Sequence, residues 1–276
     1  MILPRPRSAK PGISTTLASI HIHPVKSLGG FAVQQVRLTD RGLEHDRRWM
    51  LVDPQGSFLS QRECPEMACL HTAPAAAGFT VTDVRNGSVL HLPWELESGP
   101  SVHAQMWNDA VDLLLADHGV NGWYSEALQR PVRLAFMPQR TVRITDRTYA
   151  EVRVALNDAF PALVISQASL DDLNARLSTP VPMERFRPNL VIAGGAAFQE
   201  DTWRTVRIGP VRFHLVKPCA RCVIPNTDQR TGVRLKEPLR TLASYRTVGN
   251  KVLFGMNATF DAPGPLHVGD PVTYDG

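Results

Sequence analysis

The sequence predicts a mostly β protein with a few short helices, an α+β fold. Short segments in which apolar and polar residues alternate recur from residue 17 to the end, for example "LASIHIH" and "VRFHLVKP", and this alternation is typical of half-buried strands. Asn86-Gly87 lies between "FTVTDV" and "SVLHL", which is a strong hairpin signal. Many short strands separated by glycines and prolines favour a barrel-like or sandwich architecture.

Two stretches have helical character. "GWYSEALQRP" predicts a short helix with Ser125 near its start. "LDDLNARL" predicts a second helix, capped by Ser169 with Asp172 as the acidic residue of a capping box. Pro180 and Pro182 follow and are expected to end it.

Composition narrows the class of protein. The 276 residues suggest one large or two modest domains, and the net charge of +4 suits an anionic small ligand. No run of 18 apolar residues occurs, so we expect no transmembrane helix, and residues 1–16 resemble a flexible tail without a signal sequence. We therefore expect a cytoplasmic protein. No block of basic and aromatic residues supports nucleic-acid binding. The polar run at 135–150 suggests a domain boundary.

Cys219 and Cys222 form a Cys-x-x-Cys pair with Arg221 between them. A redox dithiol would need a helix directly after the pair, but "VIPNTD" follows. A zinc site would need two further ligands, and Cys64 and Cys69 lie far away in the sequence. A buried structural pair and a single thiolate ligand to a soft metal both remain open on the spacing alone.

Several basic segments have the composition of anion sites. "HPVKSLGG" joins Lys26 and Ser27 to two glycines, and "ERFRPN" places Arg185 and Arg187 on one face if the segment is extended. "HDRRW" brings Asp46, Arg47, Arg48 and Trp49 together at a strand start. For each segment the ordinary alternative is a turn, a solvated strand end or a buried ion pair. His21 and His23 could chelate a metal, although a histidine pair without a third ligand is more often structural.

Taken in order, "PVKSLGG", "GLEHDRRWMLVD", "LSQRECPEM", "ERFRPNLVI", "KPCARCVIPNTDQRTG" and "HVGDPV" resemble the MOSC family. The resemblance is greatest to the subgroup with a MOSC N-terminal β-barrel-like domain, which includes YcbX-type proteins and the mitochondrial amidoxime reducing component. It covers residues 17–275. It implies a tail at 1–16, an N-terminal domain at 17–135 and a MOSC domain at 136–276. The strands around 17–50 would complete the main β-barrel, into which the smaller domain is inserted.

The resemblance also implies a molybdenum cofactor, with Cys222 as the metal ligand and catalytic residue and with Cys219 nearby but not ligating. Arg221 would keep the Cys222 thiol deprotonated. Asp228, close to the motif, is a candidate proton donor. The cofactor-binding residues carried over from the family pattern are Lys26, Ser27, Arg47, Arg187, Asn189, Ala220, Arg221 and Cys222.

The function that this resemblance implies is reduction of small N-hydroxylated compounds by oxygen abstraction at the molybdenum. From these residues we expect neither the C-terminal ferredoxin domain of YcbX-type relatives nor the membrane anchor of the mitochondrial ones. We therefore expect electrons from a separate ferredoxin or flavin-reductase type of protein. The alternative is a binding module that carries the cofactor or transfers sulfur through a Cys222 persulfide. The resemblance also leaves open an association with pyridoxal phosphate.

Overall fold

The protein is described here by a computed structural model that covers residues 14–145 and 147–275. Residues 1–13 of the predicted tail lie outside the described residues, and the first strand, β1, begins at Thr16. The described residues form nineteen strands and three α-helices, joined by short 3₁₀ turns. The prediction of a mostly β fold with a few short helices is therefore confirmed.

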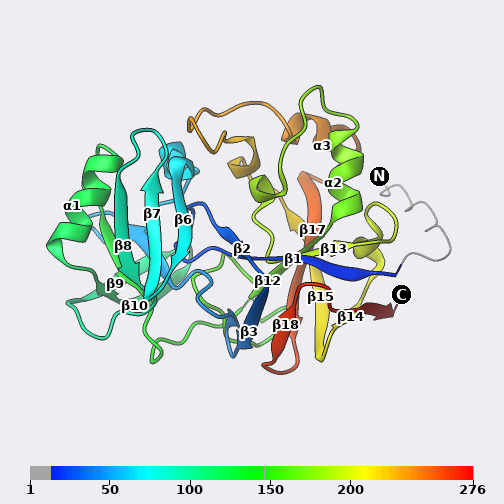
Figure 1. Ribbon diagram of the computed structural model, residues 1–276, viewed down its shortest axis with the longest axis horizontal. Helices are drawn as coiled ribbons and strands as arrows, with labels where there is room; N and C mark the ends of the chain where they lie inside the picture. The colour runs from blue at the N-terminus through cyan, green and yellow to red at the C-terminus, as the bar shows by residue number, and fades with distance from the viewer. Residues whose placement is uncertain (1–13, 146, 276) are drawn as a thin grey trace.

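The largest sheet has nine strands, and it includes a strand from the start of the chain. Their order is β19, β14, β15, β17, β12, β13, β1 and β2, with β16 paired to β17. β1 lies between β2 and β13, so residues 16–22 form an interior strand that joins β2 to the strands from the second half of the sequence (Figure 1). The nine strands are β1 (Thr16–Ile22), β2 (Phe31–Val33), β12 (Ala162–Ser166), β13 (Leu190–Ala193), β14 (Thr205–Ile208), β15 (Val211–Ala220), β16 (Thr247–Val248), β17 (Lys251–Phe260) and β19 (Val272–Asp275).

Three smaller sheets complete the fold. A four-stranded sheet consists of β5 (Trp49–Val52), β9 (Ser101–Met106), β10 (Asp109–Leu115) and β11 (Arg133–Phe136). One three-stranded sheet consists of β6 (Leu70–Ala75), β7 (Gly78–Asp83) and β8 (Val89–Pro93). The other consists of β3 (Gln35–Thr39), β4 (Gly42–Leu43) and β18 (Pro265–His267). The β7–β8 turn contains Asn86-Gly87, as the hairpin signal predicts.

We call residues 49–136 the small part, and residues 16–43 with 162–275 the large part. Figure 1 shows them side by side, with the β5–β11 strands in one and the nine-stranded sheet in the other. Two segments, 44–48 and 137–161, link them. The links are hydrogen bonded to each other, because Met137 N donates to the Arg48 carbonyl (2.8 Å) and Leu156 N donates to the Arg47 carbonyl (3.0 Å). The predicted domain limits remain a prediction.

Each part has its own apolar core. In the large part, alternate residues of β1, β14 and β15 pack against one another and around Trp203. In the small part, Trp49 packs against Phe136 and Phe79, with ring centroids 4.8 and 6.5 Å apart. Trp49, at the start of β5, is thus a core residue rather than part of an anion site.

The helices begin earlier than the sequence pattern predicts. α1 spans His118–Ala127 and is capped by Asp117, so Ser125 lies near its end, where Ser125 Oγ donates to the Asn121 carbonyl (2.8 Å). α2 spans Gln167–Asn174, and its cap is Ser166, whose Oγ accepts from Ser169 N (3.1 Å). The prediction that Ser125 lies near a helix start and the prediction that Ser169 is a cap were therefore wrong, because each helix begins about one turn before the predicted position.

α3 spans Leu239–Arg246 and packs with α2 over one face of the large sheet (Figure 1). The short 3₁₀ turns are Pro65–Cys69, Met183–Phe186, Gln199–Thr202 and Ile224–Asn226. In the described part of the chain, no helix has both the length and the apolar character that a bilayer crossing requires.

Candidate active site

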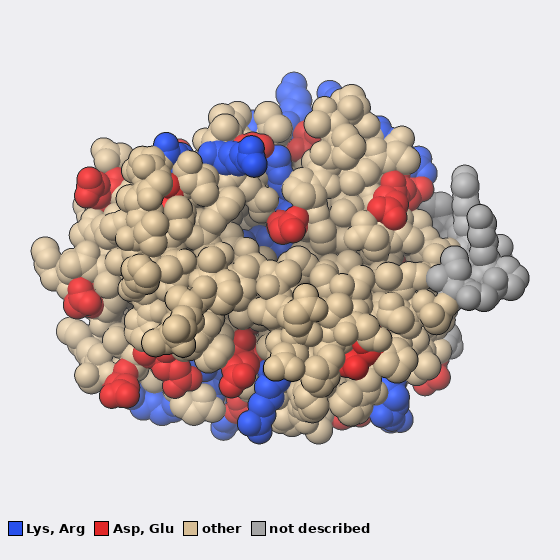
Figure 2. Space-filling model, viewed as in Figure 1, with Lys and Arg blue, Asp and Glu red and all other residues tan. Residues whose placement is uncertain are grey.

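A cavity of about 280 Å³ lies between the small and the large part. Figure 2 shows the hollow between the two parts, with basic side chains on its floor and along one rim. The structure brings all eight of the predicted cofactor-binding residues to this cavity. The eight lining residues that the sequence predicted are Lys26, Ser27, Arg47, Arg187, Asn189, Ala220, Arg221 and Cys222.

The turn after β1 places Lys26 and Ser27 in the cavity. Lys26 N donates to the Trp49 carbonyl (2.7 Å), which ties the turn to the first residue of β5. Ser27 has a φ of +68°, and Gln61 Nε2 donates to its carbonyl (2.5 Å). The small part therefore holds the backbone of this turn, while Lys26 and Ser27 line the cavity. A local composition signal alone cannot reveal this.

The "ERFRPN" segment is not extended, so the prediction that its two arginines share a face was wrong. Met183–Phe186 form a 3₁₀ turn that ends at Arg187 in the left-handed region (φ +54°). This turn points the two side chains apart. Arg187 lines the cavity, and its Nη1 donates to the Leu28 carbonyl. Arg185 instead pairs with Asp228 (2.9 Å) and donates to the Thr227 carbonyl (2.5 Å).

Asp46 is the centre of the polar network beneath the cavity, and its side chain is only 1% exposed. It accepts from His23 N (2.8 Å), from Arg47 Nη1 (2.5 Å) and from Asn157 Nδ2 (3.1 Å). Arg47 also donates to the Asn189 side chain (3.3 Å). These contacts join His23, Asp46, Arg47, Asn157 and Asn189, which come from four separate parts of the chain. The buried Asp46 carboxylate therefore sets the position of the Arg47 guanidinium.

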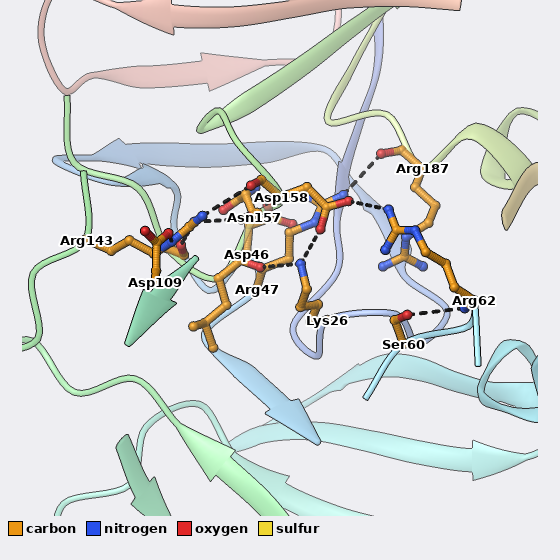
Figure 3. A network of polar contacts seen from close by, with 12 residues as sticks. Lys26, Asp46, Arg47, Ser60, Arg62, Asp109, Arg143, Asn157, Asp158 and Arg187 are labelled. Carbon is orange, nitrogen blue, oxygen red and sulfur yellow. Dashed lines mark hydrogen bonds and ion pairs between the residues drawn. The ribbon is translucent and has the colours of Figure 1, made fainter. Parts of the chain in front are cut away.

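Asp158 faces the cavity between two cations. Lys26 Nζ donates to one of its carboxylate oxygens, and Arg62 Nη2 donates to the other at 2.9 Å (Figure 3). Desolvation works to raise the pKa of Asp158, but the charges of Lys26 and Arg62 outweigh it and hold that pKa well below its usual range. The sequence analysis missed Asp158 and Arg62. The polar turn "LND" and the "SQRE" segment were the only local signals, and neither points to a cavity.

β15 carries Cys219 to the cavity, and Cys222 follows two residues after the strand ends. Both thiols are free and partly buried. Arg221 does not act as predicted, because its Nη1 donates to Cys219 Sγ (3.1 Å) and its Nη2 donates to the Phe186 carbonyl (2.6 Å). The thiol that Arg221 contacts is therefore that of Cys219.

The other cysteines do not complete a metal site. Cys64 and Cys69 are buried in the small part, and burial together with Glu66 raises the pKa of Cys64 to about 11. Across residues 14–145 and 147–275, no group of three or more histidine, cysteine, aspartate or glutamate side chains is placed to hold a metal ion. A zinc site built from cysteines of both halves is thus excluded for the described residues.

The cavity has an excess of positive charge. Burial is the main reason that the pKa of Lys26 falls to about 8 and that of Arg187 to about 9, and the neighbouring Arg47 lowers both further. The Asp158 charge only partly offsets this effect at Lys26. An anion bound here would relieve the repulsion, so the electrostatics favour an anionic ligand.

The lowered pKa of Lys26 predicts a pH-dependent affinity for sulfate, whose own charge is constant between pH 7 and pH 9. Lys26 is protonated below its folded-state pKa of about 8 and loses its charge above it. The affinity should therefore fall about tenfold from pH 7 to pH 9, the limit for linkage to one proton. Calorimetric titration would measure it. Lys26→Arg should remove most of the pH dependence, and an equal fall in that variant would contradict the assignment to Lys26.

Comparisons with known proteins show the family to which the chain is related. A model of the MOSC domain matches residues 151–273, and a model of the MOSC N-terminal beta barrel domain matches residues 14–131. The chain belongs to the MOSC family. Mitochondrial amidoxime reducing component 2 of Rattus norvegicus is 35% identical over 281 residues, which cover 93% of this chain and 82% of that protein. Mitochondrial amidoxime-reducing component 1 of Homo sapiens is 32% identical, with the same shares covered.

This MOSC-family chain is also similar to a much longer protein. Molybdenum cofactor sulfurase of Oryza sativa subsp. japonica is 35% identical over 267 residues, which cover 89% of this chain but 32% of the sulfurase. The chain thus spans about a third of that relative. Membership of the family, a relation to proteins named for molybdenum cofactor chemistry and the mostly β fold are therefore established.

Three sequence candidates lie outside the cavity of this MOSC-family protein. Asp228 does not line it, since its carboxylate pairs with Arg185 and accepts from Arg230 N and Thr231 N (both 3.0 Å), so the structure does not support it as a proton donor. His21 and His23 do not converge on a metal site. The His21 ring bonds with Ser19 Oγ (2.9 Å) and the His23 ring with the Pro188 carbonyl (3.3 Å).

Proposed function

We propose that this protein is a molybdenum-cofactor-dependent reductase of small N-hydroxylated compounds. The observation that carries the proposal is one cavity in which an anion cradle and the Cys222 thiol lie together. The amidoxime reducing components, which this chain matches over 82% of their length, support the choice of reaction. We propose in addition that a separate ferredoxin or flavin-reductase type of protein supplies the electrons, and that the protein acts in the cytoplasm.

The side chains that line the cavity fit a pterin that ends in a phosphate. Six of them are cationic and only one is a carboxylate, Asp158. The buried Arg187 guanidinium donates to a backbone carbonyl and has no recorded carboxylate partner among the described residues, so it is available to a phosphate. A cysteine on the same wall is the kind of ligand that a soft metal prefers. The cationic residues are Lys26, Arg47, Arg62, Arg187, Lys217 and Arg221.

In this proposal Lys26, Ser27, Arg47, Arg187 and Asn189 hold the anionic end of the cofactor, and Cys222 holds its metal. The backbone of the Ala220-Arg221 segment lines the cavity beside them. When bound, the cofactor supplies two-electron reduction, which together with two protons converts an N-hydroxyl group to an N–H group and water.

The chain's own residues prepare the cavity for this chemistry. Asp46 and Asp158 fix the directions of Arg47 and Lys26, so their positive charges face the ligand without rearrangement. Phe160, Leu163 and Phe186 add apolar surface to the lining of the cavity. Such apolar surface lowers the local dielectric and strengthens the attraction between the cations and the bound anion.

A second function is a binding module that carries the cofactor or transfers sulfur through a Cys222 persulfide. The likeness to molybdenum cofactor sulfurase favours it, although it extends over a third of that protein only. Both functions use the same cavity and the same thiol. They differ in whether the loaded protein turns over an N-hydroxylated substrate.

Turnover of benzamidoxime with an artificial reductant separates the two functions. The protein should be produced in a host that makes molybdenum cofactor, and its molybdenum and zinc contents measured by mass spectrometry. A reductase should contain near-stoichiometric molybdenum and form benzamidine. Molybdenum without turnover would favour the binding module. Absence of molybdenum in a competent host would contradict both.

A further inference from the structure

Arg62 reaches across the cavity from the small part. It follows Ser60, whose Oγ accepts from Arg62 N (3.2 Å), and its side chain is 23% exposed. Its Nη2 donates to Asp158 at 2.9 Å, and its guanidinium lies over the ring of Trp107 at 4.7 Å from the ring centroid. An ion pair on one side and an aromatic face on another hold this long side chain in one place at the mouth of the cavity.

Arg62 and Cys222 line the same cavity. Burial lowers the pKa of Arg62, but Asp158 and Cys222 raise it by more. Arg221, the other arginine near the thiol, is turned toward Cys219 and the Phe186 carbonyl. Arg62 is thus a cation from the small part that lies beside the thiol on which the proposed chemistry depends.

Trp107 occupies a position that a bulky residue rarely takes. It is the first of two residues in the turn between β9 and β10, where glycine or asparagine is favoured, and its φ is +55°. The side chain is 44% exposed, although it contacts Phe58 with ring centroids 4.8 Å apart. An unfavourable backbone conformation that exposes a large aromatic surface is typical of functional sites.

Two pairs of contacts join this aromatic cluster to the cavity. Arg62 lines the cavity and covers Trp107, and Lys26 also lines it, with Nζ 5.5 Å from the centre of the Phe58 ring. A second hollow of about 440 Å³ is lined by Phe58, Trp107 and Gln105 among others. Phe58 and Trp107 thus line this hollow and also contact Lys26 and Arg62, which line the cavity.

We propose that Arg62 is a substrate-binding residue that donates hydrogen bonds to the N-hydroxyl group beside Cys222. Trp107 is then the positioning residue, since its ring fixes the orientation of the Arg62 guanidinium. This inference rests on the proposed function. A guanidinium has five N–H donors, and the ion pair with Asp158 engages the Nη2 nitrogen, so other donors can reach the acceptor atoms of an oxime or hydroxylamine. Its planar face also suits stacking against a flat amidoxime or N-hydroxylated base.

Steady-state kinetics with two substrates test this assignment. Benzamidoxime has a flat body and an N-hydroxyl group, whereas hydroxylamine has the N-hydroxyl group alone. Arg62→Gln should raise KM for both about tenfold, the effect of one hydrogen bond to a charged group, and change kcat less. Arg62→Lys should recover part of the loss. Trp107→Ala should raise KM about threefold, and Trp107→Phe, which keeps an aromatic face, should restore it.

Arg212→Gln is the matched control, because Arg212 is half exposed on β15 and lies outside the cavity. Molybdenum content is measured for every variant. An unchanged KM in Arg62→Gln would overturn the inference. A loss of molybdenum from Arg62→Gln would also overturn it, since Arg62 would then hold the cofactor rather than the substrate.

Equilibrium dialysis of benzamidoxime with the purified protein keeps this test separate from the proposed function. Wild-type protein should bind the compound about ten times more tightly than Arg62→Gln, whether or not turnover is detected. If wild type binds but does not reduce benzamidoxime, the reductase proposal fails and the site assignment stands. Equal binding to wild type and Arg62→Gln, or no binding to wild type, would show that Arg62 is not a substrate-binding residue.

Discussion

Cys222→Ser will lower the rate of benzamidoxime turnover at least about a hundredfold, whereas Cys219→Ser will retain most of the wild-type rate. A serine hydroxyl is a poor ligand for a soft metal and stays protonated at neutral pH, so it cannot replace a thiolate. Both cysteines line the same cavity and both are partly buried. The two variants therefore form a matched pair in which only the identity of the proposed ligand differs.

Two further measurements are made on both cysteine variants together with the turnover assay. Mass spectrometry gives the molybdenum content of each variant, and fluorescence after oxidation gives its pterin content. Cys222→Ser should retain pterin, because the Lys26 and Arg187 cradle is intact, while turnover is lost. If Cys219→Ser loses as much turnover as Cys222→Ser, the two thiols act together and the single-ligand assignment is wrong.

Asp46→Ala will destabilise the fold by about 3–5 kcal/mol, the cost of removing one partner from a buried ion pair. The Asp46 side chain is 1% exposed and the Arg47 side chain 11% exposed, so water can replace little of the lost interaction. The amide N–H of His23 and the side chain of Asn157 also lose an acceptor. Urea unfolding, followed by tryptophan fluorescence, measures the change.

The same substitution should weaken sulfate binding, because Arg47 loses the group that aims it at the cavity. Asp112→Ala is the control, since Asp112 is 79% exposed and its partner His103 is 70% exposed. Exposed pairs contribute little to stability, so this variant should unfold at the wild-type urea concentration. If both variants lower the urea midpoint by a similar amount, burial of Asp46 does not determine how much this residue contributes to stability.

Local patterns predicted much of the fold and most of the candidate cavity. Alternation predicted β14 and β15, because half-buried strands leave a period of two in the sequence. Short apolar runs between turn residues predicted β13 and β17, which are mostly buried. The resemblance brought Lys26, Arg187 and Cys222 together although they are far apart in the chain, and the structure places all three at one cavity. Their roles in cofactor binding remain predictions.

What the sequence could not reveal depends on long-range geometry. Arg62 and Asp158 are 96 residues apart, and neither has a local signal that distinguishes it from a surface charge. The direction of Arg221 toward Cys219 depends on the end of β15, and the divergence of Arg185 and Arg187 depends on one left-handed residue.

The interior place of β1 has a consequence for dividing the chain. β13 pairs with β12 on one side and with β1 on the other. A fragment restricted to residues 136–276 would therefore expose β13 as an unpaired edge, with the row of free amide and carbonyl groups that promotes aggregation. The same cut would remove Lys26 and Arg47 from the cavity. Residues 17–135 and 136–276 carry different domain names, but we expect that neither can be produced as a soluble fragment without the other. Engineering of this protein should keep residues 16–48 covalently joined to the rest.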